Sequence, residues 1–151
     1  MPAKNGSKTA KGSAKKFVRD VMTANPVCCT PETTVMDAAR KMRSEDIGDV
    51  LVQEDGKVCI MTDRDVVVRV IAEGRDPLNT RLSEVCSTDV ATVSPDTPIA
   101  TAIGLMRDKA IRRLPVVEDG QPVGIVSLGD LAERQDPKSA LADISAAPPN
   151  N

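Results

Sequence analysis

Two short motifs with the same residue types could hold a polar ligand. Thr62 is followed three residues later by Asp65, and Ser127 is followed three residues later by Asp130. An ionised carboxylate accepts strong hydrogen bonds from a diol. The unpaired N–H groups at the start of a helix suit a phosphate. Each motif therefore predicts a place where a hydroxyl-bearing, phosphorylated molecule could bind.

The same spacing also has a purely structural interpretation. Ser/Thr-x-x-Asp at the start of a helix is close to a capping box, in which the two side chains satisfy backbone N–H groups. On this interpretation the motifs only begin helices, and each cap contributes about 1 kcal/mol. A duplication copies caps as faithfully as binding sites, so the occurrence of two motifs does not separate the alternatives.

Basic residues distinguish the second motif from the first. Arg112 and Arg113 stand before an apolar segment, and a guanidinium group binds phosphate in a bidentate manner. The first copy has Gly48-Asp49 in their place, and the carboxylate of Asp49 would repel a phosphate, although Arg64 could partly compensate. Alternatively, Arg112 and Arg113 are solvated or paired with acids, because residues 17–151 carry more acids (22) than bases (15). We expect the second motif to be the stronger site.

A glycine difference points the same way. The second copy has Val123-Gly124 before Ile125, whereas the first copy has only Cys59 before Ile60. Glycine would allow a ligand to approach the backbone closely, and Cys59 would place a Cβ and a thiol in the way. The first site is therefore expected to be empty or to take an uncharged group.

Both motifs belong to an internal repeat that covers most of the chain. A displacement of 64 positions, which becomes 65 after one residue missing from the first copy, brings the two halves into register. Aligned pairs include Val21 with Val85, Met42-Arg43 with Met106-Arg107, Glu54-Asp55-Gly56 with Glu118-Asp119-Gly120, and Asp65 with Asp130. Two copies predict one compact body with pseudo-two-fold symmetry.

The periodicity within each copy predicts the order strand, helix, strand, strand, helix. Apolar residues at i, i+3, i+4 and i+7 predict amphipathic helices that begin near Val35 and Ile99. Thr34 (or Thr33) and Thr97 are suitable N-caps. Strands are expected at residues 50–52, 58–61, 114–117 and 123–126, with Glu-Asp-Gly turns inside each pair. After the first motif a helix is predicted, although the β-branched side chains within residues 66–71 also suit a strand. The predicted fold class is α+β.

Composition excludes several kinds of active site. The 151 residues include no histidine, so Ser-His and Cys-His nucleophiles are excluded, and we expect no enzyme and no required cofactor. The four cysteines lack CxxC spacing, which argues against a zinc site. We expect them to be reduced and mostly buried; a bridge from Cys28 or Cys29 to Cys59 stays open. Phe17 is the only aromatic residue, so no platform exists for stacking bases.

The ends of the chain differ from the repeat. Residues 1–16 contain five lysines and no acid and are predicted to be a disordered basic tail, for which a solubilising role is favoured over nucleic-acid binding. The predicted repeats span residues 17–79 and 80–135, and residues 136–151 are predicted to be a flexible tail. No run of 18 apolar residues and no signal-peptide core is present, so a cytoplasmic protein without a membrane segment is expected.

Four segments of the repeat resemble a known family. Residues 18–23 (VRDVMT), 59–65 (CIMTDRD), 112–117 (RRLPVV) and 120–130 (GQPVGIVSLGD) are similar to the cystathionine β-synthase (CBS) domain, present as a tandem pair. The resemblance covers about residues 17–135 and is closest to stand-alone bacterial CBS pairs. It implies two repeats packed sheet to sheet, with clefts that hold AMP, ADP, ATP, NADH or S-adenosylmethionine. In this family the aspartate takes the ribose hydroxyls and the Ser/Thr faces the phosphates.

Carried over to this sequence, the resemblance implies two unequal ligand sites. The stronger site comprises Ser127, Asp130, Arg112 and Arg113, with adenine held among Val90, Ala91, Leu114 and Val116; the weaker site comprises Thr62, Asp65, Arg64, Val50 and Val52. The expected function is a regulatory module that senses an adenosine-containing ligand and signals to an unidentified protein partner, as a homodimer. The alternative is a dimeric interaction scaffold with vestigial ligand sites.

Overall fold

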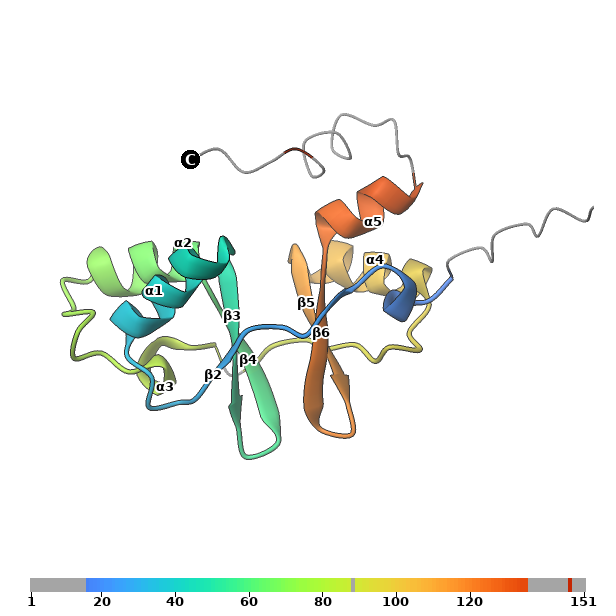
Figure 1. Ribbon diagram of the computed structural model, residues 1–151. Coiled ribbons are helices and arrows are strands. Elements are labelled where there is room, and N and C mark those ends of the chain that lie inside the picture. Colours follow the sequence, from blue (N-terminus) through green and yellow to red (C-terminus); the bar gives the residue numbers. More distant parts are fainter. Residues whose placement is uncertain (1–15, 88, 136–146, 148–151) are drawn as a thin grey trace, which may run out of the picture.

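The computed structural model describes residues 16–87, 89–135 and 147. The predicted tails, residues 1–16 and 136–151, lie outside this range except for Lys16 and Ala147. Figure 1 shows two small β-sheets at the centre of the molecule, with helices on their outer sides. This arrangement confirms the predicted α+β class.

Each half of the molecule contains one three-stranded sheet. In the first, β2 (Cys28–Cys29) runs parallel to β3 (Asp49–Glu54), which pairs in antiparallel fashion with β4 (Lys57–Thr62). In the second, β6 (Gln121–Ser127) is antiparallel to both β1 (Thr23–Ala24) and β5 (Arg113–Glu118). The helices of the first half are α1 (Val35–Glu45), α2 (Asp63–Asp65) with its continuation as a π-helix (Val66–Ile71), and α3 (Leu82–Val85). Those of the second are a 3₁₀ turn (Val18–Asp20), α4 (Ile99–Lys109) and α5 (Leu128–Gln135).

Local sequence explains where the long helices begin. The Thr34 hydroxyl accepts a hydrogen bond from Asp37 N at 3.2 Å, so the predicted cap of α1 is confirmed. The prediction that Thr97 caps α4 is wrong, because Pro98 takes the N-cap position without a side-chain hydrogen bond. The Thr97 hydroxyl instead accepts from Ser94 N at 3.0 Å and closes the preceding turn.

The two Glu-Asp-Gly segments form the predicted hairpin turns. Asp55 and Gly56 both have positive φ angles, 48° and 74°, and Asp119 and Gly120 repeat them at 50° and 75°. Two consecutive left-handed residues give a type I′ turn, whose twist matches that of the flanking strands. The β3–β4 and β5–β6 hairpins are therefore equivalent in the two repeats.

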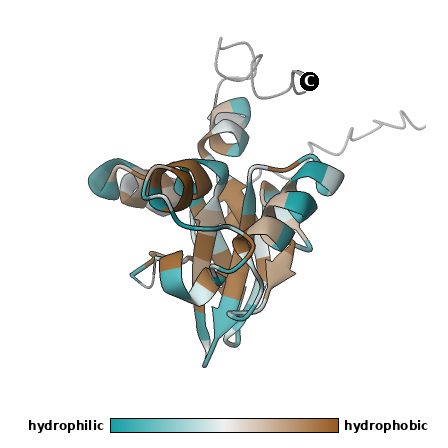
Figure 2. Ribbon diagram, turned by 90° about the vertical axis from the view of Figure 1, so that its left-hand side faces the viewer, coloured by the Kyte–Doolittle hydropathy of each residue, from teal (hydrophilic) through white to brown (hydrophobic). Residues whose placement is uncertain are grey.

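The apolar residues form one core in each half, between the sheet and its helices. Val35, Ala38, Val50, Val52, Met61, Val70 and Leu82 belong to the first core, and Val18, Ala102, Met106, Leu114, Val116, Val126 and Leu131 to the second. In Figure 2 the central parts of the strands are largely brown, that is apolar, as is one of the helices beside them. Leu51 and Val58 are buried but belong to neither core, since alternate residues of a strand face opposite sides of the sheet.

The second side of each sheet faces the other repeat. Strand β3 contacts β6 and β4 contacts β5, so the predicted sheet-to-sheet packing is confirmed. At the turn end of the hairpins, Gln53 Nε2 donates a hydrogen bond to Gly120 O at 3.2 Å. Burial of Leu51 and Val58 between the sheets stabilises the pairing of the two repeats.

Each repeat is completed by the segment that precedes the other. Val18 N donates to Thr97 O at 2.9 Å, and Val18 is fully buried in the second core. Leu82 N makes the equivalent bond to Thr33 O at 2.9 Å, and Leu82 is fully buried in the first core. The predicted boundary between residues 79 and 80 follows the sequence repeat. In the structure, however, a segment from each side of this boundary packs into the core of the other half.

The cysteines depart from the sequence prediction. Cys59 and Cys86 form a disulfide with Cα atoms 6.3 Å apart, within the range that a disulfide spans. Cys28 is exposed and Cys29 is buried, and both are free thiols. The expectation that all four are reduced is therefore wrong, and Cys59 bonds neither Cys28 nor Cys29. Burial raises the pKa of the Cys28 and Cys29 thiols against the opposing effect of Lys41, so they are poor nucleophiles at neutral pH.

Candidate functional site

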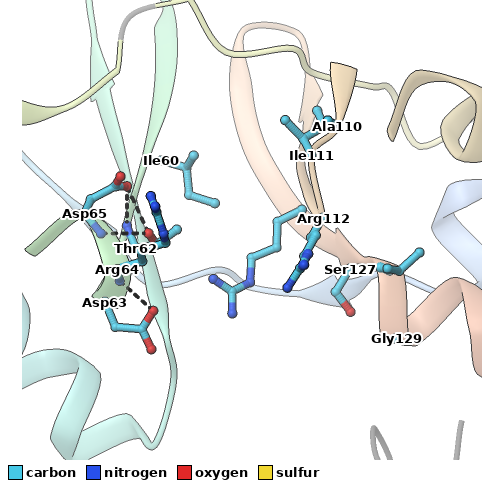
Figure 3. Close-up of a pocket in the computed structure, with 12 residues that line it drawn as sticks. Ile60, Thr62, Asp63, Arg64, Asp65, Ala110, Ile111, Arg112, Ser127 and Gly129 are labelled. Atoms are coloured by element: carbon cyan, nitrogen blue, oxygen red, sulfur yellow. Dashed lines mark hydrogen bonds between the residues drawn. The ribbon is translucent and has the colours of Figure 1, made fainter. Parts of the chain in front are cut away.

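A cavity of about 1000 Å³ lies between the two repeats (Figure 3). Its lining consists of Ile60, Thr62, Asp63, Arg64 and Asp65 from the first repeat, and Ala110, Ile111, Arg112, Arg113, Ser127, Leu128 and Gly129 from the second. Residues of both predicted ligand sites thus line one shared space, although Asp130 of the second motif is not among them.

The hairpin strands bring the two motifs to this cavity. Strand β4 ends at Thr62, which is followed by α2, and β6 ends at Ser127, which is followed by α5. Backbone hydrogen bonds fix both strand-to-helix junctions: Asp63 N donates to Gly48 O at 2.9 Å, and Leu128 N donates to Arg112 O at 2.8 Å. The junctions are equivalent under the repeat and lie on opposite sides of the cavity.

The first motif forms a complete capping box. Asp65 Oδ2 accepts from Thr62 N and from the Thr62 hydroxyl, both at 3.0 Å, and Asp65 N donates to that hydroxyl oxygen at 3.2 Å. The other oxygen, Oδ1, lies 3.6 Å from Arg69 Nε. Arg69 also donates to Val85 O at 3.0 Å, which holds its guanidinium in place. Both oxygens of Asp65 are therefore engaged within the protein.

The second motif makes the same cap with one oxygen. Asp130 Oδ2 accepts from Ser127 N at 2.8 Å, and Asp130 N donates to Ser127 Oγ at 3.1 Å. Within the described part of the chain, Asp130 Oδ1 has no hydrogen-bond or ion-pair partner. The structural interpretation thus holds for both motifs. In the second motif, however, the cap leaves one carboxylate oxygen over for a ligand.

The three arginines of the cavity differ in their pairing. Arg113 Nε lies 3.2 Å from Asp49 Oδ2, so this guanidinium is paired with an acid of the other repeat. The side chains of Arg64 and Arg112 make no ion pair or hydrogen bond to any residue that the structure describes. Figure 3 shows Arg112 between Thr62 and Ser127, where its charge faces the cavity.

Asp49 occupies an unfavourable electrostatic environment. Burial raises the pKa of its carboxyl group, the nearby Asp63 raises it further, and Arg113 lowers it. Gly48 allows this crowding: a Cβ at Gly48 would lie 3.2 Å from both Arg113 Nη2 and Asp63 Oδ2. One arginine and two aspartates therefore converge on the backbone at the start of β3.

The structure places several predicted ligand contacts elsewhere. Val50, Val52, Leu114 and Val116 point into the two cores, so we assign them to the cores rather than to the cavity wall. Neither Val90 nor Ala91 lines the cavity, and Ala91 packs against the second core.

The apolar wall of the cavity was missed in the sequence. It is made by Ile60, Ala110, Ile111 and Leu128. Ala110 ends α4 with a left-handed conformation (φ 52°), which turns the chain so that Ile111 and Arg112 face the cavity. A second hollow of about 350 Å³, lined mainly by apolar side chains from α4 and by Leu128, adjoins it beside Arg112. The signals in the sequence were the position of Ala110 and Ile111 directly before Arg112 and that of Leu128 directly after Ser127.

Gly124 does not leave room for a ligand. A Cβ at this position would lie 2.7 Å from Met22 Sδ and 2.9 Å from Thr23 O, so the space beside the glycine is filled by the protein itself. The explanation of Gly124 as a point of ligand approach is therefore wrong. The space beside Gly124 is filled because β1 pairs with β6, with Ala24 directly opposite Gly124.

The arrangement of two equivalent halves around one cavity agrees with comparisons to known proteins. The family model of the CBS domain matches residues 18–72 and 82–136, which together are more than half of the chain. This chain belongs to the CBS domain family. The resemblance inferred from the motifs is thus confirmed, and the molecule is a CBS pair.

Relatives of this CBS pair include proteins of similar length. The CBS domain-containing protein YhcV of Bacillus subtilis is 40% identical over 133 residues, covering 85% of this chain and 94% of that protein. The crystal structure of Hypoxic Response Protein I with two coordinated zinc ions has a TM-score of 0.70 and 31% identity, covering 78% of this chain and 97% of that one. A hexameric CBS-CP12 protein from bloom-forming cyanobacteria has a TM-score of 0.72 and 27% identity, covering 85% of this chain and 78% of that one.

Membrane-spanning helices and metal-binding clusters are both absent from the described residues. No helix among them has both the length and the apolar character needed to cross a membrane. Within the same residues, no three side chains of Cys, Asp or Glu are grouped so that they could hold a metal ion.

Proposed function

We propose that this CBS pair is a regulatory module that binds an adenosine-containing ligand in the shared cavity and signals to a protein partner. The observation that carries the proposal is the second motif, where Asp130 caps its helix and still has one carboxylate oxygen without a partner among the described residues. The charge of Arg112 and the apolar wall next to it complete the three kinds of contact that an adenosine phosphate requires.

Each part of such a ligand has a counterpart in or beside the cavity. The ribose hydroxyls donate to Asp130 Oδ1, which lies next to the lining residue Gly129 but does not itself line the cavity. The phosphate lies near Arg112 and Gly129 at the start of α5, where Leu128 N and Asp130 N already donate to Arg112 O and Ser127 Oγ. The adenine ring packs against Ile111 and Leu128, since the cavity has no aromatic side chain. Binding between the repeats would favour one relative arrangement of the two halves, which is the signal passed on.

The identity of the ligand is part of the proposal. AMP, ADP, ATP, NADH and S-adenosylmethionine all carry the adenosine group. A solved CBS pair in complex with 5′-methylthioadenosine and S-adenosyl-L-methionine has a TM-score of 0.71 and is 24% identical. At that identity the comparison concerns the fold, and the transfer of an adenosyl ligand to this chain is our own inference.

We also propose self-association as a homodimer in the cytoplasm. Val67, Val68 and Ile71 on the π-helix are exposed by 58%, 41% and 56%, an apolar surface that a second copy could cover. The solved hexameric relative shows that other assemblies occur among similar proteins. Light scattering coupled to size exclusion tests the dimer.

The competing function, a scaffold with vestigial sites, is favoured by the closed cap and ion pair of Asp65.

Isothermal calorimetry against the five ligands tests the proposal. The protein has no Trp or Tyr, so intrinsic fluorescence is of little use. We expect saturable binding that weakens at least about tenfold in Asp130→Ala, because a hydrogen bond to a charged group is lost, and is kept in Asp65→Ala. The two variants are matched, since each removes one helix cap. No heat with any ligand, together with lower stability of both variants, would favour the scaffold.

A further inference from the structure

Among the described residues, one ion pair joins the two halves of the molecule, each half being a sheet with the helices that pack on it. Arg113 of β5 and Asp49 of β3 approach to 3.2 Å between Nε and Oδ2, whereas every other ion pair among the described residues lies within one half of the molecule. The Asp49 side chain is 17% exposed and that of Arg113 is 35% exposed. The pair is thus partly shielded from water beside the cavity, which Arg113 lines, and screening is reduced there.

Asp49 reaches Arg113 because of its place in the sheet. It opens β3 opposite Thr62, so its carboxylate lies at the same strand ends as the first motif. Arg113 opens β5 opposite Ser127, the first residue of the second motif. The ion pair therefore lies beside the first residue of each motif, Thr62 and Ser127. It engages the positive charge that Arg113 would otherwise offer to a phosphate beside Ser127.

We propose that Asp49 sets the charge selectivity of the cavity by withholding Arg113 from the ligand. This inference rests on the proposed function and specifies the ligand class. A phosphate that approaches Arg113 competes with the Asp49 carboxylate for its charge, and it meets the like charge of Asp63 beside it. An adenosyl ligand without a phosphate leaves the ion pair intact. The cavity consequently favours ligands with little negative charge over polyphosphates.

The proposal also links ligand charge to the arrangement of the repeats. A phosphate that takes Arg113 breaks the ion pair between β3 and β5, whereas an uncharged ligand preserves it. Phosphorylated and uncharged ligands would thus stabilise different arrangements. Asp49 is a positioning residue in this account, because it acts on the ligand through Arg113.

The test compares adenosine, AMP and ATP by calorimetry on the full chain and on Asp49→Asn. Asparagine has nearly the same shape, so the variant frees Arg113 without opening a cavity. We expect AMP to bind about tenfold more tightly to Asp49→Asn, the effect of one hydrogen bond to a charged group, and adenosine to change less than about twofold. The matched control is Asp55→Asn, which removes the same charge in the exposed β3–β4 turn at the other end of the strand.

Two further variants keep the outcome decisive. Arg113→Gln combined with Asp49→Asn should abolish the gain for AMP, since the gain depends on the freed guanidinium. Asp63→Asn should give a smaller gain than Asp49→Asn and serves if the latter does not fold. An unchanged ratio of AMP to adenosine affinity in Asp49→Asn overturns the proposal and leaves the proposed function standing. Absence of binding by adenosine, AMP and ATP in the wild type and in all variants, together with no heat from ADP, NADH or S-adenosylmethionine, overturns both.

Discussion

Cys86 and Met22 occupy equivalent places in the two halves of the molecule. The displacement of 64 residues relates Met22 to Cys86, and the displacement of 65 relates Cys59 to Gly124. Met22 packs over Gly124, where any Cβ would lie 2.7 Å from its sulfur, and Cys86 is bonded to Cys59. The same contact between a hairpin strand and the segment that covers it is therefore made by packing in one half and by a covalent bond in the other.

The disulfide predicts a stability that depends on reducing conditions. The Cys59–Cys86 bond closes a loop of 27 residues, and a loop of that size corresponds to about 3 kcal/mol of stabilisation. Addition of dithiothreitol should lower the free energy of unfolding in urea by roughly this amount. Cys86→Ser should show the lower stability without reductant, and Cys28→Ser, which removes a free thiol, should match the wild type. Four reactive thiols in the unreduced, denatured wild type would contradict the prediction.

Gly124 predicts a second effect on stability. Gly124→Ala forces apart Met22 and the β1 backbone, and overpacking of this kind costs about 1–3 kcal/mol. Gly104→Ala is the matched control, because its Cβ would meet nothing closer than Arg107 Nη2 at 3.8 Å. In the middle of α4 that change should stabilise the protein by about 0.5–1 kcal/mol. Urea unfolding monitored by circular dichroism measures both, and equal effects of the two substitutions would argue against the packing of Met22 described above.

Asp49 predicts a pH dependence with a definite sign. Its pKa is raised in the folded state, chiefly by burial, so the folded protein binds its proton more tightly than the unfolded chain does. Stability from this group is fully present below its ordinary pKa of 3.8 and is lost as the pH rises through the higher folded value. The free energy of unfolding of the wild type minus that of Asp49→Asn should therefore fall as the pH increases from about 3.8. A difference that rises over this range would show that pairing with Arg113 outweighs burial.

The two capping aspartates should differ in their effect on folding. Asp65→Ala removes a cap worth about 1 kcal/mol and also the ion pair with Arg69, which adds a few tenths. Asp130→Ala removes a cap of the same kind without a described ion pair. Asp65→Ala should thus be the less stable variant, measured by urea unfolding without ligand. The reverse order would mean that Arg69 contributes nothing to the cap.

Much of the fold could be predicted because the repeat supports every local signal twice. The Glu-Asp-Gly turns, the helix begun by Thr34 and the strands around them agree between the copies and with the structure. The exchange of Val18 and Leu82 between the halves could not be predicted, because similarity shows which segments are alike and not which copy each one packs against. The chain is long enough between elements to allow either choice.

The candidate site was predicted unevenly for a similar reason. Charged residues such as Arg112 stand out in a sequence, whereas the apolar wall made by Ile111 and Leu128 looks like any part of a core. For Arg113 the alternative of pairing with an acid is confirmed, but the identity of the acid, Asp49 of the other repeat, could not be predicted. Their contact follows from the sheet-to-sheet packing, which places the starts of β3 and β5 together.

The exchanged segments determine how the two halves can move. The chain passes from the second half to the first between β1 and β2, and it returns after α3 towards Val93, which bridges to Val116. The two halves are thus tethered to each other at two separate places along the chain, in addition to the packing of their sheets. Any change in their relative position that a bound molecule favours must be accommodated by both tethers together.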